Sequence, residues 1–295
     1  NLLFIGSCFS ENIGKKAAYY KFNSFSNPFG ILFNPKAIET LITKAVNKKK
    51  YTASDVFELN ECWHCFDAHS DLSSPVKETL INNLNQAVST TNKQIKKASH
   101  VLITLGTAWV YRSVQTDLIV GNCHKVPQKK FNKELLTVNE VESCLENISA
   151  LINHVNPKAT IIFTVSPVRH LKDGFVPNTR SKANLISAIQ QLKESENKHC
   201  HYFPSYEIML DDLRDYRFYE SDMVHPNQSA IDYIWEQFAG VWIDQTAQTI
   251  MKEVEGVQKG LQHRPFNPSS KQHQKFLNDL SQKKKSLEDR FKIHF

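Results

Sequence analysis

The chain has 295 residues, 41% of them hydrophobic, which is enough for one sizeable core, and it carries a formal net charge of +6. Much of the basic excess lies in three lysine clusters without interleaved aromatic residues, at residues 48–50, 129–130 and 283–285. Such clusters are typical of solvated loops and helix faces, so we expect no nucleic-acid partner. No run is long and apolar enough to predict a membrane span.

The six cysteines are scattered through a chain much larger than a disulfide scaffold: Cys8, Cys62, Cys65, Cys123, Cys144 and Cys200. This usage predicts reduced thiols and a cytoplasmic location. The chain opens on a strand pattern rather than on a charged leader. Because it lacks an initiator Met, a leader that has been removed stays open as an alternative.

The chain begins with a short apolar run at residues 2–5, which ends at Gly6 and predicts a buried strand. Ser7 or Ser10 can cap the helix that follows. A reactive side chain at such a turn lies at a positive helix N-terminus, where backbone N–H groups stabilise a thiolate, an alkoxide or an oxyanion. Ser7 and Cys8 are therefore candidate nucleophiles.

Four further strands are predicted, and helical apolar patterns separate them. The predicted strands cover residues 20–25, 101–107, 160–167 and 200–203. Three of the five strands are β-branched runs rather than alternating patterns, which indicates strands buried on both faces. The sequence therefore predicts an α/β fold, a three-layer α/β/α sandwich around a five-stranded parallel sheet.

Two stretches interrupt this regular pattern. Residues 51–73 have no clear period and predict an insertion over one edge of the sheet, and residues 111–137 predict a second, basic and irregular insertion. We expect the main domain to cover residues 1–260 and a helical tail to cover residues 261–295, where apolar residues recur at helical spacing. The tail is expected to pack on the domain or on a second copy, which would make a homo-oligomer.

Ligands of open parallel sheets bind beyond the carboxyl ends of the strands, near the point where the strand order reverses. Four residues that follow predicted strands should converge there: Cys8, Gly30, Gly106 and Ser166. Asp222 and His225 precede the next long helix, and at this spacing a carboxylate can orient an imidazole toward a nucleophile. Alone, Asp-x-x-His is a weak motif that is more typical of a capping or surface histidine, but its position on the fifth connection, together with the other residues after the strands, favours a catalytic pair.

Two cysteine motifs offer alternative sites. Cys62-x-x-Cys65, with two neighbouring histidines, resembles half of a zinc site, but the chain has no second cysteine pair at the required spacing, so we expect no metal. Cys123 and His124 suggest a second nucleophile pair. Adjacent residues in a strand or helix do not face each other, so we expect His124 to line the pocket instead.

Six motifs resemble the GSCFA-domain family, within the wider SGNH (GDSL-like) hydrolases. They are Gly6-Ser7-Cys8-Phe9-Ser10, Asn27-Pro28-Phe29-Gly30, Leu105-Gly106-Thr107-Ala108-Trp109, Gly121-Asn122-Cys123-His124-Lys125, Ser166-Pro167-Val168-Arg169-His170 and Asp222-Met223-Val224-His225-Pro226. The resemblance covers about residues 1–245. It implies a flavodoxin-like fold of the SGNH-hydrolase type, acyl chemistry on an ester and no cofactor.

The resemblance places Cys8 on the superfamily's nucleophile position and Ser7 on the position of its Asp. The rival assignment makes Ser7 the nucleophile and Cys8 a small buried apolar residue. We favour Cys8 because one residue then separates Gly6 from the nucleophile, and the strand, the glycine and the nucleophile align with the superfamily motif without a gap. A thiolate performs the same acyl transfer as an activated serine.

Gly30 matches the superfamily's oxyanion-hole glycine, whose N–H would join that of the nucleophile. The third block departs from the superfamily pattern, because Gly106-Thr107 is not followed by the usual Asn. Thr107 or Asn122 is expected to replace that donor, and the sequence leaves both open. Loss of one such donor reduces the rate on the order of a hundredfold to a thousandfold.

Residues and resemblance together predict an ester hydrolase or O-acyltransferase that acts on an ester-linked acyl group, such as acetyl, of a small molecule or carbohydrate. Cys8 (or Ser7) would attack the carbonyl, His225 would carry the proton and Asp222 would hold the imidazole. The alternative is a non-catalytic binding module that keeps the fold and the pocket, and the missing Asn favours it.

Overall fold

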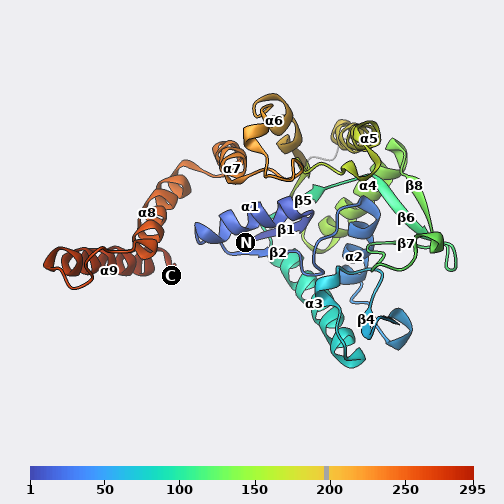
Figure 1. Ribbon diagram of the computed structural model, residues 1–295, viewed down its shortest axis with the longest axis horizontal. Helices are drawn as coiled ribbons and strands as arrows, with labels where there is room; N and C mark the ends of the chain where they lie inside the picture. Colours follow the sequence, from blue (N-terminus) through green and yellow to red (C-terminus); the bar gives the residue numbers. More distant parts are fainter. Residues whose placement is uncertain (196–198) are drawn as a thin grey trace. The chain divides into compact units, whose positions relative to one another are not determined.

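The computed structural model describes residues 1–195 and 199–295 and has a central five-stranded sheet (Figure 1). In spatial order its strands are β10 (Cys200–Phe203), β9 (Thr160–Val165), β5 (His100–Leu105), β1 (Leu2–Gly6) and β2 (Ser24–Ser26). All neighbouring pairs are parallel. Numbered along the chain, the order is 2-1-3-4-5, the doubly wound arrangement whose switch point lies between the first and third strands. The predicted five-stranded parallel sheet is confirmed.

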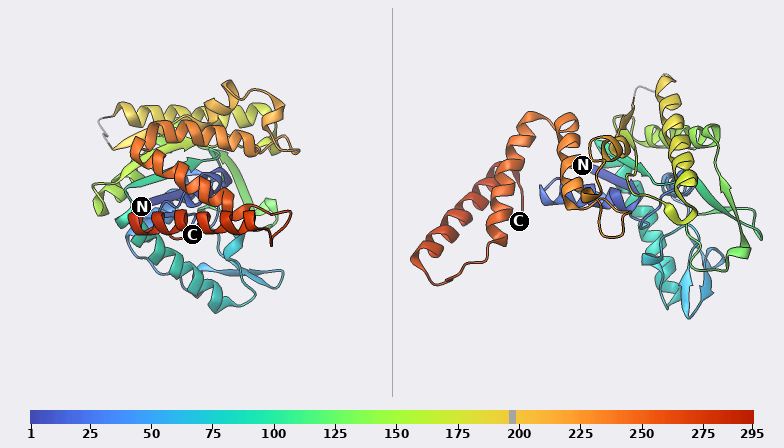
Figure 2. Two further views of the ribbon diagram at one scale, coloured as in Figure 1. Left: turned by 90° about the vertical axis from the view of Figure 1, so that its left-hand side faces the viewer. Right: turned by 45° about the horizontal axis from the view of Figure 1, so that its top comes forward.

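Helices cover both faces of this sheet, which completes the predicted three layers (Figures 1 and 2). Leu3 and Ile5 belong to the core on one face, whereas Phe4 points to the other face, and all three are at most 1% exposed. On the Phe4 side, a Cβ at Gly14 of α1 (Cys8–Tyr19) would lie 3.6 Å from the Phe4 ring. The core on the other face, which contains Leu3 and Ile5, also includes residues of four helices: α2 (Pro35–Val46), α3 (Lys77–Lys97), α4 (Val138–Val155) and α5 (Phe175–Glu194).

Helix α2 begins where the sequence provides both a cap and a rigid first turn. The Asn34 side chain accepts a hydrogen bond of 2.8 Å from the N–H of Ala37, and Pro35 occupies the first helical position. This start fixes the loop between β2 and α2. The carbonyl of Phe33, in that loop, then accepts from residues at the end of β5.

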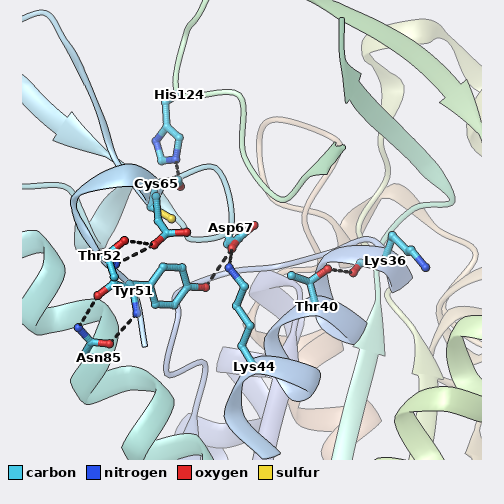
Figure 3. Close-up of polar contacts among 10 residues, drawn as sticks. Lys36, Thr40, Lys44, Tyr51, Thr52, Cys65, Asp67, Asn85 and His124 are labelled. Carbon is cyan, nitrogen blue, oxygen red and sulfur yellow. Dashed lines mark hydrogen bonds and ion pairs between the residues drawn. The ribbon is translucent and has the colours of Figure 1, made fainter. Parts of the chain in front are cut away.

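The insertion at residues 51–73 contains a hairpin of β3 (Phe57–Leu59) and β4 (Cys62–His64), between one-turn helices at Ala53–Asp55 and Ser70–Leu72. Figure 3 shows how it is held. The Asp67 carboxylate accepts from the Lys44 ammonium of α2 and, over 3.1 Å, from the hydroxyl of Tyr51. The backbone of Tyr51 exchanges two hydrogen bonds with the side chain of Asn85 in α3. The insertion is therefore fixed to two helices of the main layer.

The second insertion is ordered, so the expectation of an irregular excursion at residues 111–137 is wrong. It contains β6 (Trp109–Ser113), β7 (Ile119–Val120) and β8 (Phe131–Leu135), which form an antiparallel sheet in the order β7-β6-β8. A one-turn helix at Gln128–Lys130 precedes β8. The strands are short, and β6 pairs with β8, a strand some twenty residues further along the chain, so no local hydrophobic period predicts them.

After β10 the chain passes through α6 (Ser205–Asp211) and a one-turn helix at Tyr216–Phe218 to α7 (Gln228–Trp242). Another one-turn helix, Leu171–Asp173, lies between β9 and α5. Among the described residues, no helix is both long and apolar enough to cross a membrane.

The chain forms two compact units, residues 1–14 with 24–234 and residues 15–23 with 235–295. In the second unit, α8 (Gln245–Gln262) packs against α9 (Lys271–Phe291), at the orange-to-red end of the chain in Figure 2. Their shared core consists of Val254, Val257, Leu280 and Leu287. The predicted boundary at residues 260/261 falls within α8. Because the apolar side of α8 packs against α9, α8 belongs to the same unit as the helical tail.

Candidate active site

The turn after β1 is formed by Gly6. Its φ is +136°, and a Cβ at this position would lie 2.1 Å from the carbonyl oxygen of Thr104 in β5. The Gly6 N–H donates to Oδ1 of Asn27 over 2.8 Å, and the Ser7 N–H donates to the Thr104 carbonyl over 3.1 Å. Only glycine fits this close approach. The turn therefore starts α1 directly at the β1/β5 switch point.

Cys8 is the first residue of α1 and is half-buried. Burial raises the pKa of its thiol, and the carboxylate of Glu11 adds to this effect. The backbone N–H groups of Phe9 and of Cys8 itself, together with the Lys182 ammonium, act in the opposite direction. Burial has the largest influence, so the resting group is a thiol that needs a base.

Ser7 lies in a different environment from its neighbour. It is 2% exposed, and its Oγ is buried without a hydrogen-bond partner among the residues that the structure describes. An attacking oxygen must be reached by its substrate and must be next to a base. Of the two candidate nucleophiles, the structure leaves only Cys8 partly accessible.

Lys182 of α5 lies at the same end of the sheet, although it is only 1% exposed. Its Nζ donates 2.7 Å hydrogen bonds to the carbonyls of Gly106 and Ser166, which follow β5 and β9. Burial lowers the pKa of Lys182 to about 7, whereas the Cys8 thiolate raises it. The two carbonyl acceptors also stabilise the ammonium form.

Sequence reasoning missed Lys182, although a signal was present. The residue lies three and seven positions before Leu185 and Ile189, and therefore on the predicted apolar face of its helix. A lysine on a buried face requires polar partners at its end. Once the helix has been assigned, a lysine at such a position can be predicted to be a buried cation.

His170 connects the surroundings of Cys8 with those of His225. A Cβ at Gly106 would lie 3.2 Å from Nε2 of His170, which places the ring beside the end of β5. Burial lowers the pKa of His170 to about 4, and the positive charges of Lys182 and His225 contribute to this. The ring is therefore neutral at physiological pH and lies within electrostatic range of both groups.

Asp222 and His225 form the predicted pair. Oδ2 of Asp222 lies 2.6 Å from Nδ1 of His225, while Oδ1 accepts from the N–H groups of Val224 (2.8 Å) and His225 (3.0 Å). The N–H of His225, its ring and the N–H of Val224 together lower the pKa of Asp222 to about 2. The ionised carboxylate accepts the proton of Nδ1, so Nε2 is the basic nitrogen of the ring. Both side chains are about half exposed, at 48% and 47%.

Arg169, which follows β9, holds the loop that carries this pair. Its backbone N–H donates to the carbonyl of Val224 over 3.2 Å, and its Nη1 donates to the carbonyl of Met223 over 3.3 Å. The guanidinium lies 4.0 Å from the centre of the Tyr219 ring. The exposed loop is thus attached to the sheet through one arginine.

Of the two N–H groups predicted for the oxyanion hole, those of Gly30 and Cys8, the Gly30 N–H is already paired in this structure. The Gly30 N–H donates to the carbonyl of Asn27 over 2.8 Å, because residues 27–30 close a tight turn. The N–H groups of Gly106 and Thr107 both donate to the carbonyl of Phe33, over 2.7 and 3.1 Å. The donors that act on the Cys8 sulfur are instead the N–H groups of Cys8 and Phe9.

The two side chains expected to replace the missing Asn also have local partners. Thr107 Oγ1 lies 3.0 Å from the hydroxyl of Ser181 and accepts the N–H of Trp109 over 3.1 Å. Oδ1 of Asn122 accepts the N–H of His124 over 2.9 Å. These contacts therefore hold the Thr107 hydroxyl and the Asn122 amide beside the site and do not direct them at Cys8.

A cavity of about 420 Å³ adjoins the site through His170, and neither Cys8 nor His225 lines it. Thr107 and Asn122 do line it. His124 does not: it is 6% exposed, and its Nε2 donates to the carbonyl of Cys65 over 2.7 Å, toward the first insertion (Figure 3).

Cys62 lies in β4, and Cys65 follows it by three residues in the first insertion. Within residues 1–195 and 199–295, no three His, Cys, Asp or Glu side chains form a group that could hold a metal ion. Burial raises the pKa of the Cys65 thiol to about 12, which disfavours the thiolate that a metal would bind.

A family model described as the GSCFA family matches residues 1–238, which is most of the chain. The chain belongs to the GSCFA family. A second model, described as the GSCFA domain protein C-terminal domain, matches residues 254–295, and this range includes α9. A comparison with curated proteins gave no match. The GSCFA resemblance is thus confirmed, while the likeness to SGNH hydrolases stays a prediction.

The GSCFA match covers every residue of the candidate site. Cys8, Lys182, Asp222 and His225 all lie between residues 1 and 238, in the first compact unit. The boundary between the two GSCFA matches, at residues 238–254, contains the end of α7 and the start of α8.

Proposed function

We propose that the protein transfers acyl groups from an ester, as an O-acyltransferase or ester hydrolase, with Cys8 as the nucleophile. The observation that carries this proposal is the setting of the Cys8 thiol. It lies at the start of α1, at the switch point of the sheet, and interacts with backbone N–H groups and with a buried ammonium. A structural cysteine needs none of these partners.

The proposed reaction proceeds through a thioester. Nε2 of His225 takes the proton of the Cys8 thiol as Sγ attacks the acyl carbonyl carbon, and the tetrahedral intermediate collapses when that proton passes to the leaving alcohol oxygen. A second alcohol, or water, then attacks the thioester and gives its proton to His225; the C–S bond breaks, and His225 returns the proton to the sulfur, which restores the thiol. Asp222 stays ionised throughout and stabilises the imidazolium.

Lys182 has a separate role in this proposal. Its ammonium favours the Cys8 thiolate electrostatically, while its two hydrogen bonds fix the carbonyls of Gly106 and Ser166. A charge in a buried position acts more strongly than one in water. We therefore propose that Lys182 offsets part of the burial that raises the thiol pKa, without contacting the substrate.

The second candidate is a binding module without turnover. The observation that favours it is the pairing of the N–H groups of Gly30, Gly106 and Thr107 within the protein. An oxyanion stabilised by fewer donors is formed more slowly, by about a hundredfold to a thousandfold for the loss of one donor. A pocket without an effective oxyanion hole would still bind an ester.

The test is intact mass spectrometry after brief exposure to p-nitrophenyl acetate. We expect an acetyl adduct on the parent protein, its loss in Cys8→Ala, and slower formation in His225→Ala. Cys62→Ala is the matched control, because Cys62 is also half-buried but lines neither the proposed site nor the adjoining cavity. Its adduct should form at the parent rate.

Two results would contradict the proposal. An adduct that is lost in Ser7→Ala but retained in Cys8→Ala would move the nucleophile to the serine. Acetylation that no single substitution removes would mean that the reagent reacts with exposed lysines, and the binding module would then be the better explanation.

A further inference from the structure

The segment Gly121-Asn122-Cys123-His124-Lys125 forms a strained loop that acyl transfer at Cys8 does not explain. His124 and Lys125 have φ values of +48° and +62°. Two consecutive residues other than glycine rarely adopt this left-handed conformation, because the Cβ atom crowds the backbone. Backbone of this kind persists where the surrounding structure holds it, often beside a ligand.

The first insertion holds this loop. The carbonyl of Phe66 accepts the N–H groups of Gly121 and Asn122, over 2.7 and 3.0 Å, and Cys65 accepts from the His124 ring over 2.7 Å. A Cβ at Gly121 would lie 3.2 Å from the Phe66 carbonyl oxygen. The loop is therefore fixed at both its beginning and its middle.

The loop forms one wall of the cavity of about 420 Å³ described above. Its residues Asn122, Cys123 and Lys125 line the cavity, and Lys172 lines it from the segment after β9. Neither Lys125 nor Lys172 has an ion-pair partner among residues 1–195 and 199–295, whereas Lys133 in the same cavity is paired with Asp173. The cavity therefore holds two uncompensated positive charges.

Aromatic side chains form much of the remaining surface. Trp109 and Tyr111 of β6 and Phe131 of β8 line the cavity. Nζ of Lys133 lies 4.8 Å from the centre of the Trp109 ring. The amides of Asn122 and Gln128 also line it. A cavity of this size, with aromatic faces, amides and a few placed charges, is typical of a site for a small amphipathic ligand.

We propose that this cavity binds an anionic sugar unit. Lys125 and Lys172 take the carboxylate or phosphate, an aromatic face packs against the C–H side of the ring, and the amides hydrogen-bond to its hydroxyls. Since the cavity adjoins the site through His170, the sugar is the non-reacting part of the ester or of the acceptor alcohol. That last assignment rests on the proposed function, whereas binding itself does not.

The test is a titration of tryptophan fluorescence with glucuronate, glucose 6-phosphate, glucose and inorganic phosphate. We expect saturable quenching by one or both of the anionic sugars, at concentrations at least about tenfold below those at which glucose or phosphate acts. Trp109→Phe should remove most of the signal. Comparison of glucuronate with glucose 6-phosphate identifies the preferred anion.

Lys125→Met and Lys172→Met should each weaken the binding of the anionic sugar by about tenfold, because each removes one charge-assisted contact. Lys129→Met is the matched control, since Lys129 is an exposed lysine of the same insertion that does not line the cavity. Its binding should equal that of the parent.

Equal affinity for glucose and glucuronate, equal weakening in Lys129→Met, or no saturable quenching by either anionic sugar would overturn the proposal. Quenching by phosphate as strong as that by glucose 6-phosphate would reduce the site to one for a bare anion and would also overturn it. Cys8→Ala separates this proposal from acyl transfer, because it should lose the acetyl adduct and keep sugar binding.

Discussion

The two sides of the candidate site are built in opposite ways. On the nucleophile side, Gly6 and Lys182 are packed into the ends of the sheet, and Lys182 is 1% exposed. On the acid–base side, Asp222 and His225 lie on a loop and are about half exposed. Substitutions on the first side should therefore disturb folding as well as chemistry, while those on the second should disturb chemistry alone.

The largest effect on the buried side is expected for Gly6→Ala. The new Cβ would lie 2.1 Å from the Thr104 carbonyl at a φ of +136°, so strain and overpacking together should lower the free energy of unfolding by about 3–5 kcal/mol. Urea denaturation followed by circular dichroism measures this change.

Gly256→Ala is the control for Gly6→Ala. Gly256 lies within α8, and beyond the backbone of its own helix and its chain neighbours no atom lies within 4 Å of an added Cβ, so alanine should leave stability unchanged or raise it by up to about 1 kcal/mol. Similar unfolding midpoints for the two variants would show that the turn after β1 adapts, and the contrast between the two sides would then fail.

On the exposed side, Asp222→Ala should reduce turnover of p-nitrophenyl acetate by about a hundredfold or more. It removes the acceptor that orients His225, while the unfolding midpoint should stay at the parent value because the loop is exposed. The control is Asp215→Ala, an exposed carboxylate that also accepts a nearby backbone N–H. Equal loss of activity in both variants would assign the effect to loop structure rather than to the pair.

Lys182 makes the stability of the buried side depend on pH. Its pKa is lowered from 10.5 to about 7, so between these values the unfolded chain binds a proton that the folded chain has released. Stability should therefore rise with pH above about 7, by at most about 1.4 kcal/mol per pH unit; below about 7 both states are protonated, so this group destabilises the fold fully and adds no further pH dependence.

Measurements from pH 6.5 to 8 test this dependence, because buried cysteines, whose thiol pKa values are raised, begin to act in the opposite direction above this range. The Lys182→Met variant should lose the rise of stability with pH. The Lys182→Gln variant should lose it too, although glutamine keeps hydrogen-bond donors for the two carbonyls. A rise of the same size in the Lys182→Gln variant would assign the titration to another group.

The central sheet could be predicted because each strand is visible in a short continuous stretch of sequence. The apolar runs that became β1, β5 and β9 are continuous, and each is followed by a glycine or serine at the site. The Asp222–His225 contact follows from spacing within one loop, and the structure brings the two side chains together at 2.6 Å.

The rest depends on contacts between distant segments. Gly30 was expected to provide an N–H to the site, but the direction of that N–H is set by the turn that residues 27–30 close. Lys182 meets Gly106 and Ser166 only after α5 packs on the sheet. The pairing of β6 with β8 likewise joins residues that no local period relates.

The support of the loop at residues 121–125 has a consequence for which of its side chains can be exchanged. The Phe66 carbonyl holds the loop through the N–H groups of Gly121 and Asn122; every residue supplies a carbonyl, and every residue except proline supplies an N–H. The side chain of Asn122 accepts the N–H of His124, but the side chains of Cys123 and Lys125 take no part in these hydrogen bonds and can vary while the loop keeps its position. In the proposed sugar site, exchange of these side chains would change the ligand preference without a change in the backbone that presents them.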